Sequence, residues 1–315
     1  MNIPIFFSCD DNYIPYLTVT IQSIVDHMND YDTYSIYVLH KGISEKNMSI
    51  VKEYEKDNLS ITFISLEEKI KYISDLLDDV RDYYTQTIFY RLFIAGLFKS
   101  LTKAIYLDCD IIVNCDLAEL YNIDLKGKTL GCVVDNVVRD NEDFKIYTKA
   151  TVGVESHEYF NSGVLLIDLV EYRKNKIEEK FLYMLEHYVF KSVAPDQDFL
   201  NYVCKDSKLF IEEKWNRMPI NDGYDDEIKI IHFNMFMKPW LYDNVIYEDY
   251  FWNTAKRTPF YDKILAKKKS YTEEEKKNDL EGVKRMVEMC YEIINSRYTY
   301  NDSFEFKQSV RNYKI

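Results

Sequence analysis

Short apolar runs alternate with helical patterns over the first third of the chain, and no other feature of the sequence restricts the fold as much. The runs Ile3–Ser8, Tyr34–His40 and Ile61–Leu66 have the length and composition of strands. Between them, apolar residues recur at helical spacing over residues 17–28 and 44–56. Strands that alternate with helices predict an α/β fold with a mostly parallel central sheet flanked by helices.

Comparable segments follow in the middle of the chain, and the composition then changes near Lys256 to a Lys- and Glu-rich tail. This tail predicts a solvated linker followed by a packed helix. We therefore predict two units, residues 1–255 and a helical C-terminal extension over residues 256–315. The further expected strands are 104–107, 130–134, 163–167, 209–212 and 228–233, the expected helices are 87–98, 170–191 and 197–202, and the apolar positions of the tail helix are Val283, Met286, Val287, Cys290, Ile293 and Ile294.

Charge, cysteine spacing and hydropathy exclude several classes of protein. A formal net charge of −13 repels polyanions, which argues against nucleic acid as a partner. The six cysteines form no C-x-x-C pair, so we interpret them as buried thiols and not as zinc ligands or disulfides. No apolar run approaches the roughly 18 residues that cross a bilayer, and residues 1–7 resemble a strand and not a signal peptide. A cytoplasmic location is therefore expected.

Two aspartates, Asp108 and Asp110, stand one residue apart where the apolar run 104–107 ends, and residues 111–113 are apolar again. The carboxyl ends of strands in open α/β sheets form ligand sites. Two carboxylates at such a place can hold Mg²⁺ or Mn²⁺ together with diphosphate oxygens. Unpaired carboxylates between buried strands would be costly. A metal site is the favoured interpretation, and a solvated turn is the alternative.

His232 and Lys238 are candidate partners of the two aspartates. His232 follows the apolar run 228–231, and an imidazole ligand favours Mn²⁺ over Mg²⁺. Lys238 would supply a cation for phosphate in an otherwise acidic chain. Taken alone, His232 is typical of a hydrogen-bonded core histidine and Lys238 of a solvated loop lysine. The chain lacks both G-x-G-x-x-G and G-x-x-x-x-G-K-[ST], which argues against a dinucleotide enzyme or a P-loop kinase.

The motifs taken together resemble glycosyltransferase family 8, the retaining enzymes of GT-A fold that include bacterial lipooligosaccharide galactosyltransferases and glycogenin. They stand in the family's order over about residues 1–242; each is weak alone, and the ordered set is specific. The matching pieces are Ser8-Cys9-Asp10-Asp11-Asn12-Tyr13, Tyr90-Arg91-Leu92, Leu107-Asp108-Cys109-Asp110, Tyr159-Phe160-Asn161-Ser162-Gly163-Val164, Asp196-Gln197-Asp198, Trp215-Asn216, His232-Phe233 and Lys238-Pro239-Trp240.

The resemblance implies a role for each matching position. It makes Asp108, Asp110 and His232 the ligands of Mn²⁺, with Mg²⁺ as the alternative ion. It assigns the nucleotide part of a UDP-sugar donor to Ser8, Asp10, Asn12, Cys109 and Lys238, and the surroundings of the donor sugar to Arg91, Asp135, Asn161, Asp196 and Gln197. Each position also has a structural alternative, such as a strand-entry turn at Asn161 or a helix N-terminus at Asp196 and Gln197 after Pro195.

The implied reaction is the transfer of a hexose to a glycan or a lipid-linked saccharide with retention at the anomeric carbon. A metal and Lys238 would stabilise the departing UDP. Because a neutral amide is a poor nucleophile, Gln197 favours front-face attack, and galactose is slightly preferred over glucose as the donor sugar. The stretch 233–237 departs from the family, since relatives often carry a glycine there that lets the backbone approach phosphate.

Basic and aromatic residues alternate over residues 252–269, which is compatible with peripheral contact with an anionic membrane from its inner face. A solvated helix end explains the same pattern. For the whole chain, the alternative to an enzyme is a catalytically silent protein that binds a sugar nucleotide or a glycan. A nucleotidyltransferase is disfavoured, because the chain lacks the Gly-rich phosphate loop of that class.

Overall fold

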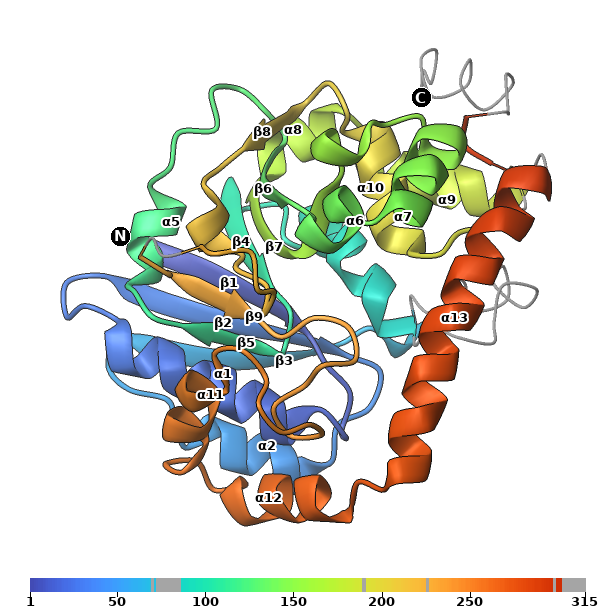
Figure 1. The fold of residues 1–315 in the computed structure, drawn as a ribbon. Coiled ribbons are helices and arrows are strands. Elements are labelled where there is room, and N and C mark those ends of the chain that lie inside the picture. Colours follow the sequence, from blue (N-terminus) through green and yellow to red (C-terminus); the bar gives the residue numbers. More distant parts are fainter. Residues whose placement is uncertain (69–70, 72–85, 189–190, 225–226, 297–298, 302–315) are drawn as a thin grey trace.

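The structure, a computed structural model, describes residues 1–68, 71, 86–188, 191–224, 227–296 and 299–301 (Figure 1). Its strands are β1 (Asn2–Ser8), β2 (Thr33–His40), β3 (Leu59–Ser65), β4 (Lys103–Leu107), β5 (Ile111–Val113), β6 (Leu130–Val134), β7 (Phe160–Asp168), β8 (Lys208–Phe210) and β9 (Ile230–His232). Its α-helices are α1 (Ile14–His27), α2 (Glu45–Lys52), α4 (Ile94–Leu97), α5 (Leu117–Tyr121), α6 (Asn136–Asp140), α7 (Glu142–Tyr147), α8 (Leu169–Lys174), α9 (Ile177–His187), α10 (Pro195–Val203), α11 (Glu248–Ala255), α12 (Tyr261–Ser270) and α13 (Glu273–Ser296). Shorter helical segments are η1 (Gln86–Phe93), η2 (Thr148–Val152), η3 (Ser156–Glu158) and η4 (Glu213–Trp215).

A seven-stranded sheet with the order β3-β2-β1-β4-β7-β6-β8 forms the centre of the molecule. The strands from β3 to β4 pair in parallel, as the βαβαβ pattern of the first third predicts. β7 pairs antiparallel with both β4 and β6, and it is the one strand of this sheet that runs the other way. The expected mostly parallel α/β sheet is therefore confirmed.

Helices cover both faces of this sheet (Figure 1). Alternate residues of each strand point to opposite sides, so apolar side chains on both faces pack against helices. Ile5 and Phe7 of β1 join a core cluster that includes residues of α1, α2, α11 and α12. Phe6, which lies between them, joins a second cluster with residues of η1, α8, α9 and α10. Both clusters extend to the carboxyl end of β4, so the polar residues that follow β4 lie between two apolar layers.

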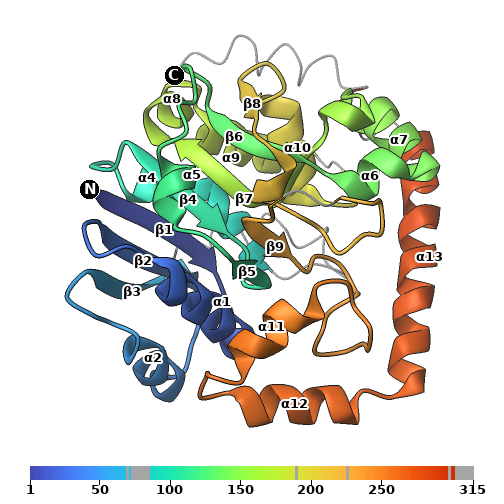
Figure 2. The same cartoon turned by 60° about the vertical axis from the view of Figure 1, so that its left-hand side comes forward.

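Three expected elements differ from the observed ones in where they divide, in helix type or in strand pairing. The helix expected over 170–191 is divided into α8 and α9, because Lys176 adopts a left-handed conformation at φ 52°. Residues 189–190 of the expected helix lie outside the described residues. The helix expected over 87–98 begins as the 3₁₀ segment η1 and becomes α-helical only in α4. The strand expected over 228–233 is β9, which leaves the main sheet and pairs antiparallel with β5, as Figure 2 shows.

Residues after 255 continue to pack on the α/β body. Ile264 of α12 belongs to the core cluster beside α1, and Cys290 and Ile293 of α13 belong to the second cluster. The predicted packing of the tail helix is thus confirmed near its C-terminal end, whereas Val283 is 39% exposed. The division at residue 255 stays a prediction, and residues 302–315 of the expected extension lie outside the described chain. None of the described helices is both long and apolar enough to cross a bilayer.

Candidate active site

Asp108 and Asp110 lie in the short link between β4 and β5, at the carboxyl end of the parallel strands. The link is held from two sides. The Asp108 amide donates to the carbonyl oxygen of Gly163 on β7 at 2.8 Å. From α1, the Thr20 hydroxyl donates to the carbonyl oxygens of Cys109 and Ile111, at 3.1 and 2.7 Å. This bracing fixes where both carboxylates point.

His232 completes a cluster with the two aspartates, because the β5–β9 pairing sets it opposite Ile111 and hence beside Asp110. Its Nε2 lies 3.2 Å from Asp110 Oδ1 and 3.7 Å from Asp108 Oδ2. One ligand atom from each of the three residues lies within 4.8 Å of the others. The three predicted metal ligands therefore converge on one point.

The other oxygen of each carboxylate is bound by a cation. Asp108 Oδ1 accepts from Arg91 Nη2 at 3.0 Å and from the Tyr106 hydroxyl at 2.8 Å. Asp110 Oδ2 forms an ion pair with Lys238 Nζ. Each aspartate thus has one oxygen engaged and directs the second towards His232 Nε2. In the described part of the chain, Asp110 Oδ1 is buried without a hydrogen-bond donor.

The imidazole of His232 is oriented by a chain of amides. His232 Nδ1 lies 3.0 Å from Asn216 Oδ1, and Asn216 Nδ2 donates to Asn161 Oδ1 at 3.0 Å. Because an amide oxygen can only accept, this arrangement assigns the proton of a neutral imidazole to Nδ1. Nε2 then carries a lone pair aimed at the carboxylates. Two carboxylate oxygens and a bare imidazole nitrogen form a donor set that fits Mn²⁺.

Gly163 makes room for this cluster. A Cβ atom at Gly163 would lie 2.2 Å from His232 Cε1 and 2.7 Å from Asp108 Oδ2, which no side chain tolerates. The glycine is therefore needed for close approach of β7 to the metal-ligand cluster, while its backbone also carries the hydrogen bond from Asp108.

Burial and charge act against each other at the ionisable groups. Burial alone would raise the pKa of Asp110, but the ammonium of Lys238 lowers it below its usual value. Burial would lower the pKa of Arg91, but Asp108, Tyr106 and Asp196 raise it above its usual value. Burial raises the pKa of Asp196, and Arg91 only partly offsets this. The cluster thus keeps Asp110 ionised and Arg91 charged although both lie in the interior.

A second polar group lies behind Asp108 and contains the residues expected around the donor sugar. Gln197, on the first turn of α10, accepts from the Ser162 amide at 2.9 Å and donates to Asp135 Oδ2 at 3.2 Å. Asn161 donates to the same Asp135 oxygen at 3.0 Å. Asp196 accepts from the Ser162 hydroxyl at 3.1 Å and pairs with Arg91 Nε at 3.2 Å. These contacts connect Arg91, Asp135, Asn161, Asp196 and Gln197 into one network.

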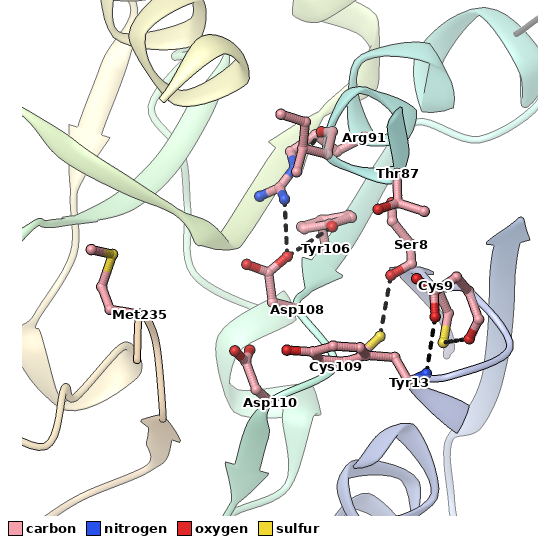
Figure 3. Close-up of a pocket in the computed structure, with 12 residues that line it drawn as sticks. Ser8, Cys9, Tyr13, Thr87, Arg91, Tyr106, Asp108, Cys109, Asp110 and Met235 are labelled. Carbon is pink, nitrogen blue, oxygen red and sulfur yellow. Dashed lines mark hydrogen bonds and ion pairs between the residues drawn. The ribbon is translucent and has the colours of Figure 1, made fainter. Parts of the chain in front are cut away.

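A cleft of about 490 Å³ opens in front of the two aspartates (Figure 3). Of the residues expected to bind donor, Ser8, Asp10, Arg91 and Cys109 line it with Asp108 and Asp110. Asp10 shapes the loop after β1, since its Oδ1 accepts from the amides of Asn12 and Tyr13 at 2.9 and 3.0 Å. Asn12 is exposed and does not line the cleft, nor do Asp135, Asn161, Asp196, Gln197, His232 and Lys238.

Sequence reasoning missed four residues of this centre. Tyr106 could have been found, because strand alternation sets it on the same face as Asp108 two residues later. Ser162, Gly163 and Asn216 stood in the matching motifs without a role, and their contacts connect segments that are distant in sequence. No local pattern could have shown which partners they meet.

Comparisons with known proteins show the family to which the chain belongs. The sequence profile of glycosyl transferase family 8 matches residues 4–244. A provisionally assigned glycosyltransferase of Haemophilus influenzae is 32% identical over 219 residues, which cover 68% of this chain and 63% of that protein. The lipopolysaccharide 1,2-glucosyltransferase of Escherichia coli K12 is 29% identical over 259 residues, which cover 74% of this chain and 71% of that enzyme.

Solved structures show the same fold. The galactosyltransferase LgtC, in complex with donor and acceptor sugar analogues, superposes with a TM-score of 0.66 and 25% identity over 82% of this chain and 96% of its own. The bifunctional glycosyltransferase WbbM reaches a TM-score of 0.72 at 23% identity, over 85% of this chain and 52% of that one. The match therefore spans less than two thirds of the Haemophilus relative and about half of WbbM. With its matching profile, its GT-A architecture and its ordered motifs, the chain belongs to glycosyltransferase family 8.

Proposed function

We propose that the chain is a retaining hexosyltransferase that moves galactose or glucose from a UDP-sugar to a saccharide acceptor and depends on Mn²⁺. The observation that carries this proposal is the convergence of His232 Nε2 and two carboxylate oxygens, one of them buried and unbonded, beside a cleft of about 490 Å³. Asp108, Asp110 and His232 would hold the ion, with Mg²⁺ as the alternative. When bound, the ion supplies positive charge for the diphosphate of the leaving UDP.

The side chains around the cleft divide the remaining work. The loop at Asp10 and Asn12, with Ser8 and Cys109, binds the nucleotide. Lys238, whose ammonium reaches Asp110, lies close enough to the ligand cluster to contact a diphosphate on the same ion. Arg91 and Asp196 position the donor sugar through the network that ends at Gln197.

Gln197 is the residue proposed at the anomeric carbon. Its amide is held at both ends, by the Ser162 amide and by Asp135, so its orientation is determined before substrate binds. A neutral amide stabilises positive character on the sugar and is a poor nucleophile. We therefore favour front-face attack, in which the leaving phosphate accepts the proton of the acceptor hydroxyl. A glycosyl adduct trapped on any side chain, detected by intact-protein mass spectrometry, would contradict this mechanism.

The acceptor and location are part of the same proposal. Because relatives include lipopolysaccharide glucosyltransferases, a bacterial cell-surface saccharide made in the cytoplasm is the acceptor class we infer. Residues 1–255 form the catalytic unit and 256–315 the extension. Membrane contact through 252–269 would rest on exposed basic residues such as Lys256, Lys263 and Lys269, since the large apolar side chains there are buried or half-buried, namely Trp252, Phe260, Tyr261, Ile264 and Leu265.

The test is UDP release from UDP-galactose, UDP-glucose and their N-acetyl forms, with Mn²⁺ or with EDTA. Release should need the metal and fall about a hundredfold or more in Asp110→Asn, because one carboxylate ligand is lost. Asp57→Asn makes the same chemical change on an exposed loop and should leave the rate unaltered. Donor binding by calorimetry without turnover of any donor would instead support a silent binding protein.

A further inference from the structure

Helix α13 (Figure 1) is attached to the described body of the protein near both of its ends, and Met286 and Met289 between them pack against the second core cluster. Near its N-terminus, Asp279 Oδ2 accepts from the hydroxyls of Tyr242 and Tyr271, both at 2.6 Å. Near its C-terminus, Cys290 and Ile293 are buried, and the Tyr291 hydroxyl donates to Asp143 of α7 at 2.6 Å. A helix of 24 residues spans about 36 Å, and its middle turns carry Gly282, Met286 and Met289.

A cavity of about 590 Å³ lies under these middle turns. One wall is Phe236, in the loop between β9 and α11. The opposite wall is α13, with the half-buried Met286 and Met289 and the backbone of Gly282. A Cβ at Gly282 would lie 3.5 Å from Cζ of the Phe236 ring, so the absence of a side chain there leaves space between the ring and the helix. We call this cavity the α13 groove.

The α13 groove and the donor cleft share one wall. Met235 lines the donor cleft and the next residue, Phe236, lines the groove. His232, one of the three predicted metal ligands, and Lys238, the ion-pair partner of Asp110, lie on either side of this pair in the sequence. Met235 also adopts the left-handed conformation at φ 59°, which is costly for a residue with a side chain and is typical of functional loops. The groove therefore opens beside the loop that borders the donor cleft.

The lining of the groove selects a class of ligand. An aromatic ring and two methionines offer an apolar surface, and Asn278, Arg285 and Glu288 stand exposed around it. This combination of one apolar face with a polar rim matches a sugar ring. Asp279, Glu288 and Glu292 outnumber Arg285, so the local charge is negative and disfavours phosphorylated or carboxylated ligands.

We propose that the α13 groove is the acceptor subsite and binds a neutral saccharide, with Phe236 stacking on the sugar ring and α13 setting acceptor specificity. The inference rests on the proposed transferase function and adds a site contributed by a helix that lies beyond the family-matched residues 4–244. It predicts that changes in the groove alter use of the acceptor and leave cleavage of the donor intact.

Direct binding is tested first, by NMR of the full chain labelled at the methionine methyl groups. Titration with methyl β-galactoside, methyl β-glucoside, lactose and maltose should shift the Met286 and Met289 signals, which are assigned with Met→Leu variants, and UDP with Mn²⁺ should shift Met235. The saccharide shifts should disappear in Gly282→Leu, whose side chain fills the groove, and persist in Gly282→Ala. Saccharide shifts confined to Met235, or absent for every probe at saturating concentrations, would overturn the proposal.

Kinetics then separate this proposal from the proposed function. Donor hydrolysis without acceptor should remain within about twofold of wild type in Gly282→Leu, whereas the acceptor KM should rise roughly tenfold. Phe236→Ala should raise the acceptor KM similarly, and Phe236→Trp should restore it. Equal loss of hydrolysis and transfer in Gly282→Leu would overturn the acceptor role. Absence of both hydrolysis and transfer in the wild type, for every donor and acceptor tried, would refute the transferase function, while the NMR result would still decide whether the groove binds sugar.

Discussion

Two glycines mark the contrast between the metal-ligand cluster and the α13 groove. At Gly163 a Cβ would collide with His232 and Asp108, and at Gly282 it would make only ordinary contacts with Phe236. The cluster is built from strand ends inside the core, with nearly every polar atom paired to a distant segment. The groove is built from one helix and one loop. Under the two proposals, the chemistry that needs fixed geometry lies in the tightly packed region, and the choice of acceptor lies in the more open one.

Gly163→Ala should have the largest effect and tests whether the cluster tolerates any repacking. We expect the free energy of unfolding to fall by about 3 kcal/mol, because His232 must move to relieve the overlap. Urea unfolding followed by circular dichroism measures the loss. Gly42→Ala is the control, since a Cβ there meets nothing within 4 Å. If Gly163→Ala were as stable as this control, the cluster would be less tightly packed than its distances indicate.

Asn216→Ala tests whether the amide chain orients the metal ligand. Without the Asn216 carbonyl to accept from Nδ1, the imidazole can rotate, and we expect Mn²⁺ affinity to fall about 10- to 100-fold. Calorimetric titration with Mn²⁺ and UDP measures this. Asn201→Ala is the matched control, because Asn201 is equally buried but bonds the Phe160 backbone. A similar loss of Mn²⁺ affinity in both variants would show a general loss of structure.

Gly282→Ala makes the same chemical change in the groove as Gly163→Ala makes in the cluster. We expect it to stabilise its helix, whereas Gly163→Ala should lower the free energy of unfolding. Alanine favours the helical state by up to about 1 kcal/mol over glycine in a helix interior. We expect slower hydrogen exchange of the amides in the middle of α13, measured by mass spectrometry, with little change in β7. Faster exchange would mean that the added methyl group disturbs Phe236, and the contrast between the two regions would then be smaller.

Arg257→Gln should have the smallest effect on stability. It removes the ion pair between Arg257 and Asp26 of α1, which attaches the extension to the body. Burial raises the pKa of Asp26, but Arg257 and Gln22 lower it below its usual value. A depressed carboxyl pKa stabilises the fold above the unfolded pKa, near 3.9, and this contribution is lost as the pH falls through the folded pKa. We expect Arg257→Gln to cost about 0.5 kcal/mol at neutral pH and nothing at strongly acidic pH, by urea titration. An undiminished difference in acid would exclude an ionic origin.

Local patterns were sufficient for much of the fold. The alternation of apolar residues predicted the parallel strands from β1 to β4, because burial on both faces of a sheet demands apolar runs. The division of α8 from α9 was not predictable, since it depends on Lys176 adopting a left-handed conformation that lysine does not signal. The departure of β9 from the main sheet was hidden for a related reason, as an apolar run does not specify its partner strand.

The sequence alone determined which groups the site offers, because two carboxylates, an imidazole and an ammonium stand at Asp108, Asp110, His232 and Lys238. The tertiary structure decided which atoms are available. Pairing of β5 with β9 brought His232 to the aspartates, and Asn216 directed its bare nitrogen towards them. The tertiary structure also decided that a groove lies between α13 and Phe236. These outcomes depend on contacts between distant segments, whose energies are set by packing and are absent from any local stretch of sequence.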